Sequence, residues 1–212
     1  MSEGLPRIWI ITDPDHREGP VTPIRRALDG CPPGVLGVQL RARQASDRQL
    51  VHWGRELRQL TGDTGAILTV NRRPDLAQIV GADGVHLPER GLPPIEIRRH
   101  WPFLRIVGVS RHDRRGLEAA EREQASYAFL SPVFHVPGKA PPIGLNGFGR
   151  AIADVGIPTY ALGGIGPEDL RPLLRVGAFG VGIRRAIYTT ERPYEALQRF
   201  LGELDKSVSS GE

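Results

Sequence analysis

Eight short apolar runs, rich in β-branched residues and bounded by turn residues, recur along the whole 212-residue sequence. The runs cover residues 8–12, 35–40, 66–70, 84–87, 105–110, 127–131, 158–162 and 179–183. Segments with helical periodicity or helix-start residues lie between them. Almost continuously apolar strands that alternate with helices predict a parallel sheet, because parallel neighbours need crossover helices and these cover both sheet faces. Eight such units predict a single α/β domain, a (β/α)₈ barrel, over residues 1–205.

Helix-start residues fit this alternation. Asp47 and Asp113 are predicted N-caps, and proline precedes or opens other helical segments. These prolines are Pro20, Pro74, Pro93 and Pro167. A last helix is expected over about residues 192–204, and the tail 206–212 is expected to be disordered. An open doubly wound sheet is the alternative, but no GxGxxG motif follows the first run, where a dinucleotide-binding fold would carry it.

Composition argues against several classes of protein. No apolar stretch approaches the ~18 residues of a membrane span, and the N-terminal MSEGLPR lacks the basic and apolar regions of a signal peptide. The single cysteine, Cys31, cannot form an internal disulfide. A cytoplasmic protein without a membrane partner is therefore expected.

The charge distribution bears on partners. The net charge is +4 and the pI about 9.7, which raises the question of nucleic acid. The arginines are scattered through every segment without a basic tail, so no nucleic-acid partner is expected. Only two of the 28 basic residues are lysines, Lys139 and Lys206. Barrels of this size often pair through their outer helices, so a homodimer is compatible with the sequence. The sequence alone does not determine the oligomeric state.

In the predicted barrel, residues just after each strand gather at one mouth, where barrel active sites lie. Most of them here are cations or polar uncharged groups, with few carboxylates. The candidate substrate-binding residues are Gln39, Arg41, Arg43, Asn71, Arg72, Ser110 and Ser131. This set favours a site for a small anion with more than one charge. Loop residues are commonly polar, however, so an ordinary polar rim stays open as the alternative.

Glycine-bearing turns after the seventh and eighth strands indicate where a phosphate would bind. Barrels commonly hold phosphate there with backbone N–H groups and a helix N-terminus. Gly163, Gly164 and Gly182 match that arrangement, and Arg184 can add a guanidinium. Each glycine cluster alone is a weak signal, because turns need glycine anyway.

His112 and Lys139 are the predicted catalytic residues. His112 follows the fifth strand at the mouth, where an imidazole can act as a general acid or base. Its plainer interpretation is a solvated loop histidine beside Asp113. Lys139 lies in the long loop 131–147, which suits either a lid that closes over substrate or a spacer. His86 is expected to point into the barrel as a structural group, and the histidine spacing predicts no metal site.

Several segments resemble the thiamine phosphate synthase and TenI superfamily. QLRAR (39–43) is similar to its Q-x-R-x-K strand end, VNRRPDLA (70–77) to its V-N-D segment and GADGVHL (81–87) to its G-A-D-G-V-H-L strand. GVSRHD (108–113), SPVF with Lys139, ALGGI (161–165) and VGAFGVGIRRAIY (176–188) resemble its later motifs in the same order. The resemblance runs from the first strand to the last helix.

The resemblance implies a (β/α)₈ barrel that handles a thiazole phosphate in thiamine biosynthesis. It places the phosphate on the turns of Gly163, Gly164, Gly182 and Ile183. The synthase branch joins the thiazole phosphate to a pyrimidine pyrophosphate with Mg²⁺. The TenI branch tautomerises a thiazole phosphate carboxylate, and its proposed acid–base histidine matches His112.

Departures from the motifs separate these branches. Two aspartates that hold Mg²⁺ in the synthase are replaced by Arg72 and Gly91, and magnesium needs oxygen ligands. A metal-independent thiazole tautomerase without a cofactor is therefore the first expectation. A thiamine phosphate synthase using Mg²⁺ is the alternative, and a non-catalytic regulatory barrel that binds a phosphorylated ligand is a further one.

Overall fold

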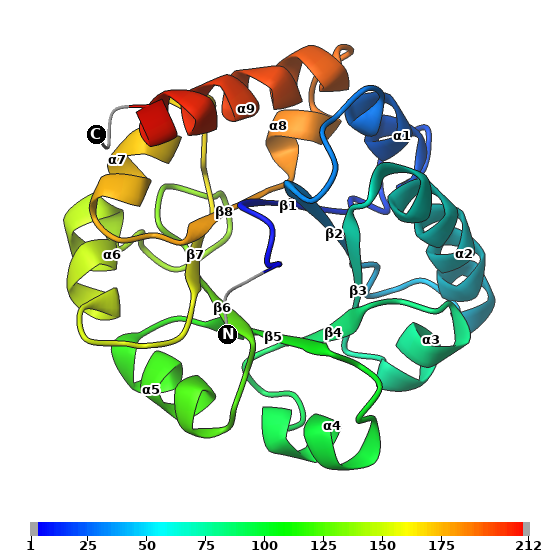
Figure 1. The fold of residues 1–212 in the computed structure, drawn as a ribbon, viewed down its shortest axis with the longest axis horizontal. Coiled ribbons are helices and arrows are strands. Elements are labelled where there is room, and N and C mark those ends of the chain that lie inside the picture. The colour runs from blue at the N-terminus through cyan, green and yellow to red at the C-terminus, as the bar shows by residue number, and fades with distance from the viewer. Residues whose placement is uncertain (1–3, 210–212) are drawn as a thin grey trace.

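The computed structural model describes residues 4–209 and is a closed barrel of parallel strands surrounded by helices (Figure 1). Each strand pairs in parallel with the next along the chain. The ring closes between the first and last strands, where Ile8 pairs with Val181 and Ile10 with Ile183. The predicted (β/α)₈ barrel is confirmed.

The element boundaries lie within a residue or two of the predicted strands. The strands are β1 Ile8–Ile11, β2 Leu36–Leu40, β3 Ile67–Asn71, β4 Gly84–Leu87, β5 Ile106–Arg111, β6 Tyr127–Leu130, β7 Thr159–Leu162 and β8 Gly180–Ile183. The helices are α1 Thr22–Leu28, α2 Asp47–Thr64, α3 Pro74–Ile79, α4 Pro94–His100, α5 Arg114–Arg122, α6 Gly144–Ile152, the 3₁₀ helix η1 Pro167–Asp169, α7 Leu170–Arg175, α8 Arg185–Tyr188 and α9 Pro193–Ser209.

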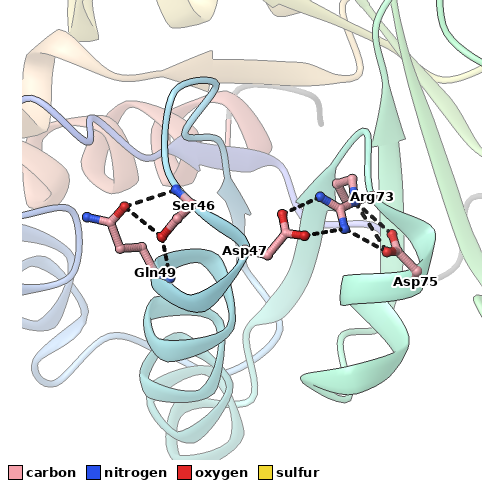
Figure 2. Close-up of polar contacts among 5 residues, drawn as sticks. All are labelled: Ser46, Asp47, Gln49, Arg73 and Asp75. Carbon is pink, nitrogen blue, oxygen red and sulfur yellow. Dashed lines mark hydrogen bonds and ion pairs between the residues drawn. The ribbon is translucent and has the colours of Figure 1, made fainter.

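Two helix starts show how local sequence sets the boundaries. Asp113 caps α5 as predicted, accepting a hydrogen bond from the Gly116 amide at 2.8 Å. The N-cap of α2 is Ser46 and not Asp47, because Ser46 and Gln49 form a reciprocal capping box (Figure 2). Asp47 is the first helical residue, and its carboxylate binds Arg73 at the start of α3.

The ends of the predicted domain need two adjustments. Helix α9 continues to Ser209, so the chain is helical past the predicted boundary at residue 205. The last three residues of the predicted tail lie outside the described residues, and disorder there stays a prediction. None of the described helices combines the length and apolar character that crossing a membrane requires.

The core has two layers, one on each side of the strands. The outer layer packs apolar strand residues such as Val38 and Leu68 against the surrounding helices. The inner layer fills the barrel with Trp9, Tyr127, Phe129 and Tyr160. Small residues on neighbouring strands leave room for these rings, and a Cβ at Gly108 would collide with the Tyr127 ring.

The N-terminal segment closes one end of the barrel. It crosses the opening of the ring before entering β1 (Figure 1). Leu5 packs against the inner aromatic layer, and the Tyr160 hydroxyl donates a 2.6 Å hydrogen bond to the Pro6 carbonyl. The carboxyl ends of the strands meet at the opposite end, where the predicted site residues follow them.

Candidate active site

Strands β2 and β3 end in a pair of amide side chains. Gln39 is only 2% exposed and donates from Nε2 to Oδ1 of Asn71 at 3.3 Å. Its own Oε1 is buried without a hydrogen-bond partner among the described residues. A buried acceptor without a partner is costly, so this oxygen suits a donor group of a bound ligand or water.

Three guanidinium groups, those of Arg41, Arg43 and Arg184, lie close together at the same mouth. Burial, Arg43 and Arg184 together lower the pKa of Arg41, while Asp13 opposes the change. The Thr12 hydroxyl fixes the backbone of Arg41, accepting from its amide at 2.7 Å and donating to its carbonyl at 3.1 Å. Repulsion among the cations favours an anion at this edge of the mouth.

Asp13 is a carboxylate that faces this cluster. Its Oδ2 lies 3.8 Å from Nε of Arg184, the residue that precedes α8. Both side chains are partly exposed, so their attraction is screened by solvent. A phosphate dianion would therefore compete well for Arg184.

Arg72 and Arg73 follow β3 in two different environments. Arg73 is held by Asp47 at 2.5 Å and Asp75 at 2.8 Å, so its charge is compensated (Figure 2). Arg72 has an exposed side chain and a left-handed backbone with φ of 68°, and its amide donates to the His86 carbonyl. Of the two, Arg72 is the cation left for a ligand.

His112 lies at the mouth after β5 and joins two other strand ends. Its Nδ1 lies 2.5 Å from the carbonyl oxygen of Ser131, and its Nε2 lies 3.8 Å from Oε2 of Glu89. Because a carbonyl only accepts, Nδ1 carries the proton. Nε2 is thus the atom that can exchange a proton, next to a carboxylate.

His86 lies inside the barrel, where the sequence placed it. It is 1% exposed, with Nδ1 3.1 Å from the Tyr127 hydroxyl and Nε2 2.9 Å from the Ser110 hydroxyl. Burial, with Arg111 and Arg41 nearby, lowers its pKa to about 3, so the ring is neutral at physiological pH. Of the three hydrogen-bonded residues Tyr127, His86 and Ser110, Ser110 is the one that lies at the mouth.

The glycine turn after β7 packs against the loop that follows β6. Gly163 and Gly164 have φ of 104° and 69°, and a Cβ at Gly164 would lie 2.8 Å from the His135 carbonyl oxygen. Among the described residues, no hydrogen-bond acceptor faces the N–H of either glycine. Two amides are thus available for a ligand. Gly182 and Ile183 are buried in β8.

Lys139 is not brought into this cluster. It lies exposed on the loop between β6 and α6, and its side chain has no ion pair or hydrogen bond with the described residues. Its predicted catalytic role and the lid function of the loop stay predictions.

Tyr127, Arg111 and the pairing of Glu89 with His112 are not among the features predicted from the sequence. Tyr127 alternates with Phe129 and Ser131, so the period of a strand could have placed all three inside the barrel. Arg111, 7% exposed, donates to the carbonyls of Ser110 and Gly116 at 2.9 and 3.0 Å. No local motif signals a contact between loops that lie 23 residues apart.

The donor set at the mouth does not fit a divalent cation. Magnesium prefers several carboxylate or carbonyl oxygens. Within residues 4–209 no group of three or more histidine, cysteine or acidic side chains could hold a metal ion. Glu89 faces His112 and Asp13 faces Arg184, so the two rim carboxylates already lie beside cationic or proton-bearing groups.

Comparisons with known proteins agree with the resemblance. A family model described as "Thiamine monophosphate synthase" matches residues 8–187. A protein of Aquifex aeolicus (strain VF5) named putative thiamine-phosphate synthase 2 is 39% identical over 180 residues, covering 84% of this chain and 95% of the relative. The putative thiamine-phosphate synthase of Geobacter sulfurreducens is 36% identical over 202 residues, covering 93% of each.

A solved structure is similar over almost the whole chain. A thiamine phosphate pyrophosphorylase from Pyrococcus furiosus superimposes with a TM-score of 0.87 at 30% identity, covering 98% of each chain. The names of these relatives match the synthase, which is the alternative expected from the sequence, and not the tautomerase, which is the first expectation.

Proposed function

This chain belongs to the thiamine monophosphate synthase family, and from that premise we propose that it binds a phosphorylated thiazole at the C-terminal mouth and moves a proton on it without a metal. The amides of Gly163 and Gly164 and the guanidinium of Arg184 would hold the phosphate. Arg41, Arg43 and Arg72 would balance a carboxylate or a second anionic group. Gln39 and Asn71 would contact the heterocycle.

The arrangement of His112 and Glu89 is the observation that carries the reaction type. In a tautomerisation one carbon gains a proton while another position of the ring loses one, with no net change in composition. Nε2 of His112 would deliver the proton, since Nδ1 is held by the Ser131 carbonyl. The substrate's own carboxylate, or Nε2 once it is neutral, would take up the proton that the ring loses. The Glu89 carboxylate, 3.8 Å away, would stabilise the imidazolium that gives it.

The synthase reaction is the second candidate, and the relatives' names favour it. In this chain it would depend on arginines to stabilise the departing pyrophosphate, because the donor set does not suit Mg²⁺. Guanidinium groups can perform such charge stabilisation. A regulatory barrel without turnover is the remaining alternative.

The deciding experiment gives the purified protein each substrate set. The tautomerase proposal expects aromatisation of the thiazole phosphate carboxylate at the same rate with Mg²⁺ or with chelator. Mg²⁺-dependent thiamine phosphate formation from the two phosphorylated precursors, without tautomerisation, would establish the synthase instead. Tight binding without either reaction would establish the regulatory barrel.

Replacing His112 tests the assigned role. His112→Asn should lower kcat by roughly 100-fold or more, because proton transfer by a positioned side chain contributes about that much. Ligand affinity should change by less than about threefold, since the arginines and amides remain. His100→Asn is the matched control, because His100 also faces a glutamate, Glu96 at 3.4 Å, but on α4. Full activity of His112→Asn would contradict the role.

A further inference from the structure

A hydrogen-bonded chain runs through the barrel interior to the mouth. The Tyr127 hydroxyl contacts Nδ1 of His86 at 3.1 Å, and Nε2 of His86 contacts the Ser110 hydroxyl at 2.9 Å. Tyr127 is fully buried, and His86 packs 4.9 Å from the Phe129 ring, centroid to centroid. Ser110 is partly exposed, so the chain ends on a hydroxyl that a ligand can reach.

The protonation states of Tyr127 and His86 in this hydrogen-bonded series are defined by their burial. Burial raises the pKa of Tyr127 well above its usual value, so the phenol keeps its hydrogen. His86 is neutral, so one ring nitrogen donates and the other accepts. The direction of one hydrogen bond therefore fixes the direction of the other.

The buried phenol determines that direction. A buried O–H needs an acceptor, and Nδ1 of His86 is the one within hydrogen-bond distance. The Thr69 hydroxyl also faces the phenol, and this contact lowers the pKa of Tyr127, so Thr69 acts as a donor to the phenol oxygen and Nδ1 of His86 remains the acceptor. When Tyr127 donates to Nδ1, the proton of His86 sits on Nε2 and is donated to the Ser110 oxygen.

We infer that Tyr127 and His86 are positioning residues that leave the Ser110 hydroxyl hydrogen free to be donated to an anionic substrate. Ser110 accepts from His86, and no other described group competes for its hydrogen. In the reverse arrangement Ser110 would donate inward and present only lone pairs to the mouth. That arrangement would repel an anion. The role in binding rests on the proposed function, but the proton positions do not.

The tautomer of His86 can be measured without any substrate. Nitrogen-15 NMR of the imidazole groups, assigned with His86→Asn, should show His86 protonated at Nε2 in the wild-type protein. Tyr127→Phe removes only the phenol hydroxyl and should shift the ring towards Nδ1 protonation, with Ser110 donating. Nδ1 protonation in the wild type, or an unchanged tautomer in Tyr127→Phe, would overturn the inference whatever the enzyme's substrate is.

A double-mutant cycle tests the consequence for binding, with thiazole phosphate carboxylate as the probe in calorimetry. Tyr127→Phe should weaken binding about fivefold to tenfold, the worth of one reoriented hydrogen bond. In a Ser110→Ala background the same change should have less than about a twofold effect, because the hydroxyl it acts on is gone. Equal effects in both backgrounds would show a merely structural role.

Tyr160→Phe controls for the loss of a buried phenol hydroxyl. Its hydroxyl donates to Pro6 at the closed end of the barrel, so binding and the His86 tautomer should not change even though stability falls. A wild-type protein that does not bind the probe at all would reject the proposed substrate while leaving the NMR result to decide the inference.

Discussion

At the scale of single residues, His86 predicts how the fold responds to acid. Its pKa is about 3 in the folded protein and near 6.5 when solvated. Between these values the unfolded chain binds a proton that the folded one does not. As the pH is lowered below about 6.5, the free energy of unfolding should therefore decrease. The contribution of this group is up to about 1.4 kcal/mol per pH unit.

Urea unfolding of wild type and His86→Asn at pH 7, 6, 5 and 4 isolates this contribution, because carboxylates titrate alike in both proteins. The groups facing His86 are Tyr127, Ser110, Arg111 and Arg41, and the two arginines stay charged over this range. His86→Asn should be less stable at pH 7 and lose less stability on acidification. Parallel curves for the two proteins would contradict the prediction.

At the scale of elements, the turn after β7 depends on two separable properties of glycine. Gly164 has a left-handed backbone and packs against the loop after β6, with a Cβ position 2.8 Å from the His135 carbonyl oxygen. Gly138, on that same loop, has φ of 73° but open space around its Cβ position. The two glycines therefore share the backbone requirement and differ in packing.

Gly164→Ala should be more destabilising than Gly138→Ala. The left-handed backbone alone costs about 1 kcal/mol for alanine, and the displaced loop should add about 1–3 kcal/mol at Gly164. Denaturant unfolding measures both variants. Phosphate-ligand affinity should fall in Gly164→Ala only. Equal losses of stability would show that the loop moves aside at no cost.

Elements could be predicted from the sequence more fully than the contacts between them. The eight strands were identifiable because each is an apolar run ended by turn residues. The predicted cap of α2 is one residue too late, since Ser46 and Asp47 are both good capping residues and only the reciprocal bond with Gln49 distinguishes them. The predicted end of α9 is too early because the last turn of this helix is mostly polar.

At the scale of the whole molecule, closure of the barrel explains why the candidate site was partly foreseeable. Residues after parallel strands must share one mouth, so Arg41, His112 and Arg184 could be grouped without knowing any distance. Pairings across the mouth, such as Glu89 with His112 or Asp13 with Arg184, depend on loop paths. Those paths are set by packing between distant segments, which no local pattern encodes.

The distribution of charge over the molecule leads to a last prediction. The net charge is +4, but the guanidinium groups proposed to bind the ligand lie at one rim, while helix ends such as Arg175 on α7 lie at the other end of the barrel. Raising salt from about 50 to 300 mM should weaken binding of thiazole phosphate carboxylate about threefold to tenfold, because the rim is accessible to ions.

Arg184→Gln and Arg175→Gln remove the same charge from opposite ends of the barrel. If the rim governs binding, Arg184→Gln weakens it at low salt and flattens its salt dependence, because a direct partner of the phosphate is lost. Arg175→Gln then changes the dissociation constant by less than about twofold at either salt concentration, since α7 runs back from the mouth and Arg175 lies in its last turn. Calorimetric titrations of the three proteins at both concentrations measure this. Equal effects of the two substitutions would mean that net charge attracts the ligand, and the rim arginines would lose their assigned role.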